Sequence, residues 1–174
     1  FSADHLERHG GIGGYLAAKR RLFTEGCPDY SVIGVDELAG LNLAQQLSAS
    51  IGDESIIRVS ATKQMRRFDW SIFLDAGYLV EHRKGKQINS IDLKVFDNFV
   101  GLHSYQNAAS AYAACRALGL SPRKIIEAMK GFDGLAHRSQ KIAMFNGITF
   151  INDSKATNVE SAMMSLNAYE NIRW

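Results

Sequence analysis

The alternation of strand-like and helix-like segments over residues 30–60 constrains the fold most. YSVIGVDE (30–37) is a short apolar run rich in β-branched residues, typical of a strand buried on both faces of a parallel sheet. Residues 38–50 have apolar side chains at helical spacing, Gly52 can end that helix, and SIIRVS (55–60) is a second buried strand. Parallel strands joined through a crossover helix predict an α/β fold.

The pattern changes after residue 62. Residues 70–93 alternate apolar and polar side chains, with turn signals at residues 76–77 and 84–86, and predict short antiparallel strands. Residues 105–118 and 122–130 predict two helices that close this unit.

A second unit is expected to begin near residues 132–138. Residues 140–153 form two apolar runs around Asn146-Gly147, a strong hairpin signal. A helix over residues 159–168 and the start of a strand at residues 171–174 should follow. We therefore expect domains over residues 1–135 and 136–174.

Composition excludes several classes of protein. The chain is 46% apolar and 22% charged with a net charge of +2, enough for one core or two small ones and without a basic tract for nucleic acid. No apolar run approaches the ~20 residues of a membrane span.

Cys27 and Cys115 lie far apart, so we expect buried, reduced thiols in a soluble cytoplasmic protein. The chain opens on Phe1 rather than Met, and we expect it to be a piece of something longer.

Three clusters of residues could carry chemistry. The first surrounds the glycines of DHLERHGGIGGYLAAK (4–19), which lack the P-loop spacing G-x-x-x-x-G-K-[ST]. The glycines are interpreted as a connection, with a helix from residue 15. His5 could ligate a divalent metal, with Asp4 and Lys19 nearby, or it could be an ordinary surface histidine.

The second cluster, HSYQN (103–107), begins an alanine-rich helix. Its polar side chains could read a ligand, or they could only cap the helix, with Ser104 as the N-cap.

The third cluster combines His137 and Arg138 with DSKATN (153–158). The latter turn could offer free amides and Lys155 to an anion, and Asp153 to a ribose hydroxyl. The alternative is a polar strand-to-helix loop capped by Asn158.

Taken together, DHLERHGG, YLAAK, GLHSYQNAASAYAA, FDGLAHRSQKI and FINDSKATN resemble the Mur ligase family along the whole chain. The resemblance implies the second half of a central ATPase domain, to about residue 135, and then the first part of a Rossmann-like C-terminal domain. The P-loop and the rest of the amino-acid pocket would lie outside the chain. Residues 1–174 alone are therefore expected to be inactive.

The resemblance also implies the roles of residues. The histidine matching His5 ligates Mg²⁺, and the lysine matching Lys19 is carbamylated, which gives the metal an anionic oxygen. Asn107 matches an adenine contact, and Arg138 and Asp153 match positions around the nucleotide. Three positions match residues near the incoming amino acid and the reacting carboxyl: His137, Lys155 and Thr157. His5, Lys19, His137 and Lys155 are thus candidate catalytic residues, and substrate binding would use His5, Lys155 and Thr157. The family often has Asn where this chain has Ser104, so no role is assigned there.

The implied reaction is ATP- and Mg²⁺-dependent formation of an amide between UDP-N-acetylmuramoyl-L-alanine and D-glutamate, by a monomer that needs no nucleic acid or membrane. INDSKATN and LAHR favour this branch of the family. One alternative is a ligase similar to folylpolyglutamate synthase. Another is a non-catalytic nucleotide-binding protein of the same fold.

Overall fold

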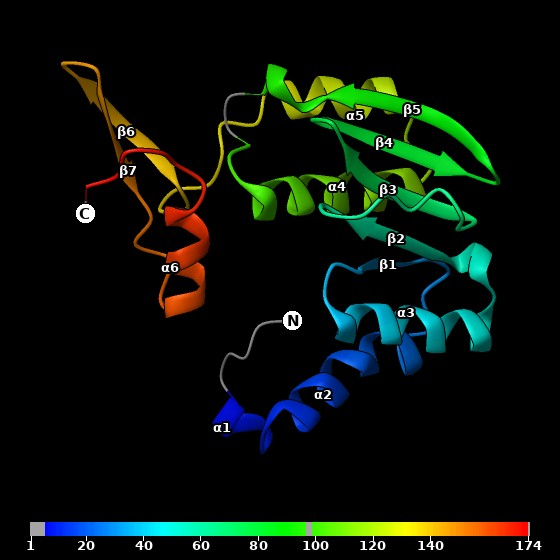
Figure 1. Cartoon of the computed structure of the whole chain (residues 1–174). Helices are drawn as coiled ribbons and strands as arrows, with labels where there is room; N and C mark the ends of the chain where they lie inside the picture. The colour runs from blue at the N-terminus through cyan, green and yellow to red at the C-terminus, as the bar shows by residue number, and fades with distance from the viewer. Residues whose placement is uncertain (1–5, 97–98, 174) are drawn as a thin grey trace.

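A five-stranded mixed sheet organises most of the chain. The computed structural model describes residues 6–96 and 99–173. The sheet has the order β1-β2-β3-β4-β5 (Figure 1). Its strands are β1 (Ser31–Gly34), β2 (Ile56–Ser60), β3 (Trp70–Asp75), β4 (Tyr78–Arg83) and β5 (Lys86–Asp92). The first three run parallel, and β4 and β5 add antiparallel to β3. The predicted α/β class is therefore confirmed.

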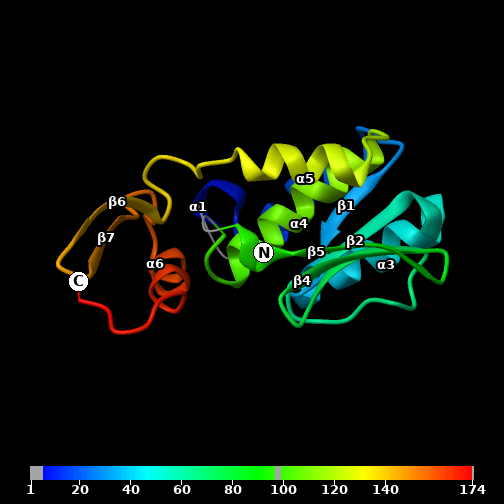
Figure 2. The same cartoon turned by 90° about the horizontal axis from the view of Figure 1, so that it is seen from above.

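Helices cover both faces of this sheet (Figure 2). On one face α3 (Leu38–Ile51) packs through Ala44 and Leu47 in a core with Phe73. On the other face α4 (Leu102–Ala117) and α5 (Pro122–Lys130) enclose the larger core. All five β2 residues are buried, because helices lie on both sides of that strand. Short 3₁₀ turns, η1 (Asp53–Ser55) and η2 (Leu93–Val95), precede β2 and follow β5.

A separate two-stranded sheet pairs β6 (Gln140–Phe145) with β7 (Ile148–Asn152). Its turn uses Asn146 and Gly147 at φ 48° and 76°, the left-handed geometry that a two-residue hairpin loop requires. The helix α6 (Val159–Leu166) follows, and its N-cap Asn158 accepts a hydrogen bond from the amide of Ser161 at 2.8 Å. The predicted hairpin and cap are confirmed.

Two expectations near the C-terminus are wrong. The α6 helix ends at Leu166 rather than residue 168. Residues 171–173 form no strand, and Trp174 lies outside the described residues. Asn171 at φ 56° bends the backbone away from an extended path.

The N-terminal segment contains α1 (Leu6–His9) and α2 (Ile12–Thr24). The α2 helix begins before the predicted residue 15, so only Gly10 and Gly11, at φ 66° and 108°, form the break. Gly13 and Gly14 are helical, because backbone hydrogen bonds outweigh the weak helix propensity of glycine here. The prediction that all four glycines form a connection is therefore wrong.

Three smaller predictions also fail. The N-cap of α4 is Gly101 at φ 81°, so Ser104 lies inside the first turn and does not cap the helix. Cys27 is exposed in the turn after α2, and Cys115 is only half-buried on α4.

Among the described residues, no helix has both the length and the apolar character to cross a bilayer.

Candidate functional site

A cavity of about 520 Å³ lies between α4 and α5 on one side and, on the other, the linker before β6, the loop after β7 and α6. This volume is within the range of small-molecule sites, roughly 300–1,000 Å³. The charged side chains that line it are Lys124, Arg138, Asp153 and Lys155, three cations against one carboxylate. The excess of positive charge suits an anionic ligand.

The cavity brings together two of the three clusters expected from the sequence. Asn107 comes from the first half of α4, whereas Arg138, Asp153 and Lys155 come from the linker before β6 and the loop after β7. His103 and Ser104 also line it, with 3.3 Å between His103 Nε2 and Ser104 Oγ. Residues more than 30 positions apart in the chain therefore face one space.

His137 and Thr157 do not line this cavity. His137 instead holds the loop together: its carbonyl accepts from the Lys155 amide at 3.1 Å, and its Nδ1 lies 3.1 Å from the side-chain amide of Asn152. The backbone of His137 is left-handed, at φ 65°. The linker and the loop after β7 thus form one unit that carries Arg138 and Lys155.

The prediction that the DSKATN turn offers free amides is wrong for three of its residues. Ser154 donates to Asn152 Oδ1, Lys155 to the His137 carbonyl, and Ala156 to the Asp153 carbonyl. Asp153 Oδ1 itself accepts from the Ser139 amide at 2.9 Å. These three amides are therefore not free for an anion, and the positive charge on this side of the cavity comes from the side chains of Arg138 and Lys155.

The first cluster lies elsewhere. Lys19 is exposed on α2, with Nζ 4.9 Å from the centre of the Tyr15 ring, and it does not line the cavity. His5 and Asp4 lie outside the described residues. Over residues 6–96 and 99–173, no group of three or more His, Cys, Asp or Glu side chains could hold a metal. An unmodified Lys19 ammonium does not fit a metal site, because it carries no lone pair.

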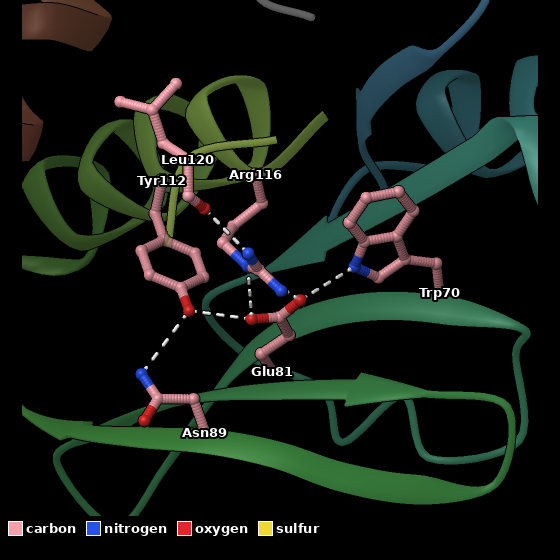
Figure 3. Close-up of polar contacts among 6 residues, drawn as sticks. All are labelled: Trp70, Glu81, Asn89, Tyr112, Arg116 and Leu120. Carbon is pink, nitrogen blue, oxygen red and sulfur yellow. Dashed lines mark hydrogen bonds and ion pairs between the residues drawn. The ribbon is translucent and has the colours of Figure 1, made fainter. Parts of the chain in front are cut away.

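A buried polar network that sequence reasoning missed holds the second half of α4 to the sheet (Figure 3). Glu81, fully buried on β4, accepts from Tyr112 Oη at 2.7 Å, from Arg116 Nε at 2.9 Å and from Trp70 Nε1 at 3.2 Å. Burial and the bond to Glu81 raise the pKa of the Tyr112 hydroxyl well above its usual value. Alternating hydrophobicity in β4 predicted a strand but gave no signal of this partner on a distant helix.

A second carboxylate holds the first half of α4. Asp36, just after β1, accepts from the Ala61 amide at 2.9 Å, from Thr62 Oγ1 at 2.6 Å and from the side-chain amide of Gln106. Burial alone would raise the pKa of Asp36, but the hydrogen bonds from residues 60–62 outweigh it and hold that pKa below its ordinary value. Gln106 directly precedes Asn107, so this contact also fixes where Asn107 lies.

Solved structures support the fold. MurF from Acinetobacter baumannii superposes with a TM-score of 0.71 at 20% identity, over 99% of this chain and 36% of that one. A pseudomurein peptide ligase type C from Methanothermus fervidus gives a TM-score of 0.67 at 15% identity, over 97% of this chain and 39% of that one.

Sequence relatives are much closer. The chain is 57% identical over 99% of its length to the UDP-N-acetylmuramoylalanine--D-glutamate ligase of Cereibacter sphaeroides (strain ATCC 17025 / ATH 2.4.3). It is 56% identical over the same share to the ligase of that name from Ruegeria pomeroyi. In both cases it spans 37% of the relative. The sequence model of the family described as Mur ligase middle domain matches residues 1–115 of the chain. Because that match covers more than half of the sequence, the chain belongs to the Mur ligase family.

Proposed function

We propose that the full-length protein is an ATP-dependent amide ligase that joins D-glutamate to UDP-N-acetylmuramoyl-L-alanine. The observation that carries the proposal is the cavity, whose lining includes Asn107, Arg138, Asp153 and Lys155. Relatives 56–57% identical over nearly the whole chain bear the name of this ligase. We place the central domain at residues 1–135 and the start of the C-terminal domain at residues 136–174.

In the proposed reaction, the alanine carboxylate attacks the γ-phosphorus of ATP, and the bond from that phosphorus to the departing ADP oxygen breaks. The amine of D-glutamate then attacks the acyl phosphate, loses a proton and expels phosphate. Each reactant is anionic, and such transfers depend mainly on positioning and on stabilisation of charge. Arg138 and Lys155 supply that positive charge, while Asn107 binds the adenine and Asp153 lies beside the nucleotide.

Four further residues complete the proposed site. Thr157 and His137 would contact the incoming amino acid and the reacting carboxyl. His5 and Lys19, the latter as a carbamate, would hold Mg²⁺, which neutralises phosphate charge when bound. Support for this metal site comes from the family resemblance, since a carbamate oxygen suits a hard cation and an ammonium does not.

The residues proposed to contact the substrates lie before, within and after the linker at residues 131–139. Movement of the C-terminal part about this linker would close the cavity over ATP and keep water from the acyl phosphate. We further propose a cytoplasmic monomer whose partners are its small-molecule substrates, without nucleic acid or membrane.

The test uses Lys155→Ala and Arg138→Ala in the full-length protein. Each removes a cation from the cavity, and phosphate release with all substrates present should fall by about 100-fold, the usual loss for one charge-stabilising group. Lys141→Ala is the matched control, because Lys141 is exposed on β6 and does not line the cavity. If the two cavity variants are as active as the control, the assignment of the cavity is wrong.

A further inference from the structure

The buried network around Glu81 reaches the wall of the cavity through two neighbours. Tyr112, which accepts from Asn89 Nδ2 at 3.3 Å and donates to Glu81, lines the cavity. Arg116 pairs with Glu81 and also donates from Nη1 to the Leu120 carbonyl at 2.6 Å. Figure 3 shows this contact between Arg116 and Leu120. Leu120 lies in the turn between α4 and α5 and lines the cavity. The network therefore connects the sheet to the inner wall of the cavity.

The chemistry of the network favours one fixed arrangement. Glu81 is fully buried and the Arg116 side chain is only 15% exposed, so each needs the other to offset its desolvation. Both Glu81 oxygens accept hydrogen bonds, and Arg116 approaches them with Nε while Nη1 is committed to Leu120. A rotation of α4 would break several of these directional bonds at once.

Asp36 fixes the other end of the same helix through Gln106, so α4 is held to the sheet near both ends. The face between these contacts carries Asn107, Ala111 and Cys115 into the cavity. A helix held in this way presents Asn107 at a fixed distance from the Leu120 turn. The inner wall is thereby preorganised for its ligand.

We infer that Glu81 is a positioning residue for the nucleotide: through Arg116 and Tyr112 it sets the spacing between α4 and the Leu120 turn that the nucleotide requires. This inference rests on the proposed function. Glu81 itself does not line the cavity, so its effect on ATP affinity must be indirect. The inference predicts that this effect can be separated from any effect on stability.

The decisive variant is Glu81→Gln with Arg116→Met in the full-length protein. The new amide can still accept from Trp70 and donate to Tyr112, and no buried charge is left without its partner, so the double variant should fold. The hydrogen bond from Arg116 Nη1 to the Leu120 carbonyl is lost in this variant. We expect the KM for ATP to rise at least about fivefold, within the range seen for indirect coupling, with kcat within about twofold of the parent protein.

Two further variants separate positioning from stability. Arg116→Met alone leaves the Glu81 charge buried, so it should lower the melting temperature more than the double variant while raising KM by a similar factor. Val80→Ala is the matched control: Val80 adjoins Glu81 on β4 but packs in the core on the opposite face of the sheet. It should lower the melting temperature and leave the KM for ATP unchanged.

A KM at the parental value in the double variant would overturn the inference, as would an equal rise in KM for Val80→Ala. Failure of the proposed function looks different, because it appears in the unmodified full-length protein: no phosphate is then released from ATP with UDP-N-acetylmuramoyl-L-alanine and D-glutamate. The positioning role in this reaction falls with it.

Discussion

Replacing Asp36 with Asn should loosen α4 while leaving the overall fold in place. The substitution keeps the shape of the side chain but turns one acceptor oxygen into a donor. In the structure Oδ2 accepts from Ala61 N and the Gln106 amide, while Oδ1 accepts from Ser60 Oγ and from both N and Oγ1 of Thr62. Whichever way the new amide faces, a donor then points at a donor.

The magnitude follows from the groups that lose their acceptor. If the new NH₂ takes the place of Oδ2, the amide of Ala61, which is only 8% exposed, has no acceptor, at a cost of about 1–3 kcal/mol. Loss of the charge weakens the remaining bonds by about 1 kcal/mol more. The total is about 2–4 kcal/mol, or a change of roughly 30- to 900-fold in an opening equilibrium.

Hydrogen exchange of the full-length protein, read by mass spectrometry, measures this directly. Amides of α4 should exchange about 30- to 900-fold faster in Asp36→Asn at pH 7, whereas those of α6 should not change. Glu37→Gln is the control, since Glu37 is the exposed carboxylate next in the chain. A change in α4 below about twofold would refute the account of this anchor.

The same comparison has a definite dependence on pH. The pKa of Asp36 is lowered in the folded protein, because its hydrogen bonds outweigh the effect of burial. Its contribution to stability is therefore full above the unfolded-state pKa, about 3.9, and is lost as the pH falls through the folded-state pKa. The difference between parent and Asp36→Asn should shrink at pH 3.

Two other substitutions test the packing and the cavity. Asp53→Ala removes the carboxylate that pairs with Arg58, whose side chain is only 2% exposed and whose Nη2 lies 2.6 Å from Asp53 Oδ1. The free energy of unfolding, measured with urea on the full-length protein, should fall by about 3–5 kcal/mol because a buried charge loses its partner. A fall below about 1 kcal/mol would contradict the reasoning. Ala111→Phe puts a ring into the cavity from an exposed position on α4. ATP affinity measured by calorimetry should fall at least about tenfold, with little change in melting temperature. Unchanged affinity would show that the nucleotide lies elsewhere.

Local signals predicted much of the fold. The hairpin turns at Ala76-Gly77 and Asn146-Gly147 could be read from the sequence, because a left-handed two-residue turn selects few residue types. The cap at Asn158 is equally local. The start of α2 was missed because rules for glycine describe single residues, whereas helix formation is cooperative along the segment.

The site was predictable only in part. The resemblance named Asn107, Arg138, Asp153 and Lys155, and these four side chains line one cavity. Nothing in the periodicity of β4 pointed to the partner of Glu81, since Arg116 lies 35 residues further along the chain. Pairs of this kind depend on how a helix docks on a sheet, which no short stretch of sequence encodes.

The central claim is tested most directly by phosphate release from the full-length protein with ATP, Mg²⁺ and UDP-N-acetylmuramoyl-L-alanine, with and without D-glutamate. We predict release that requires D-glutamate, with the stoichiometric product carrying one added glutamyl group, and no release with L-glutamate or with a folate and glutamate. Release with the folate substrate instead would identify a different ligase of the same fold. Absence of release with every acceptor would contradict the account and leave a protein that binds nucleotide without ligation.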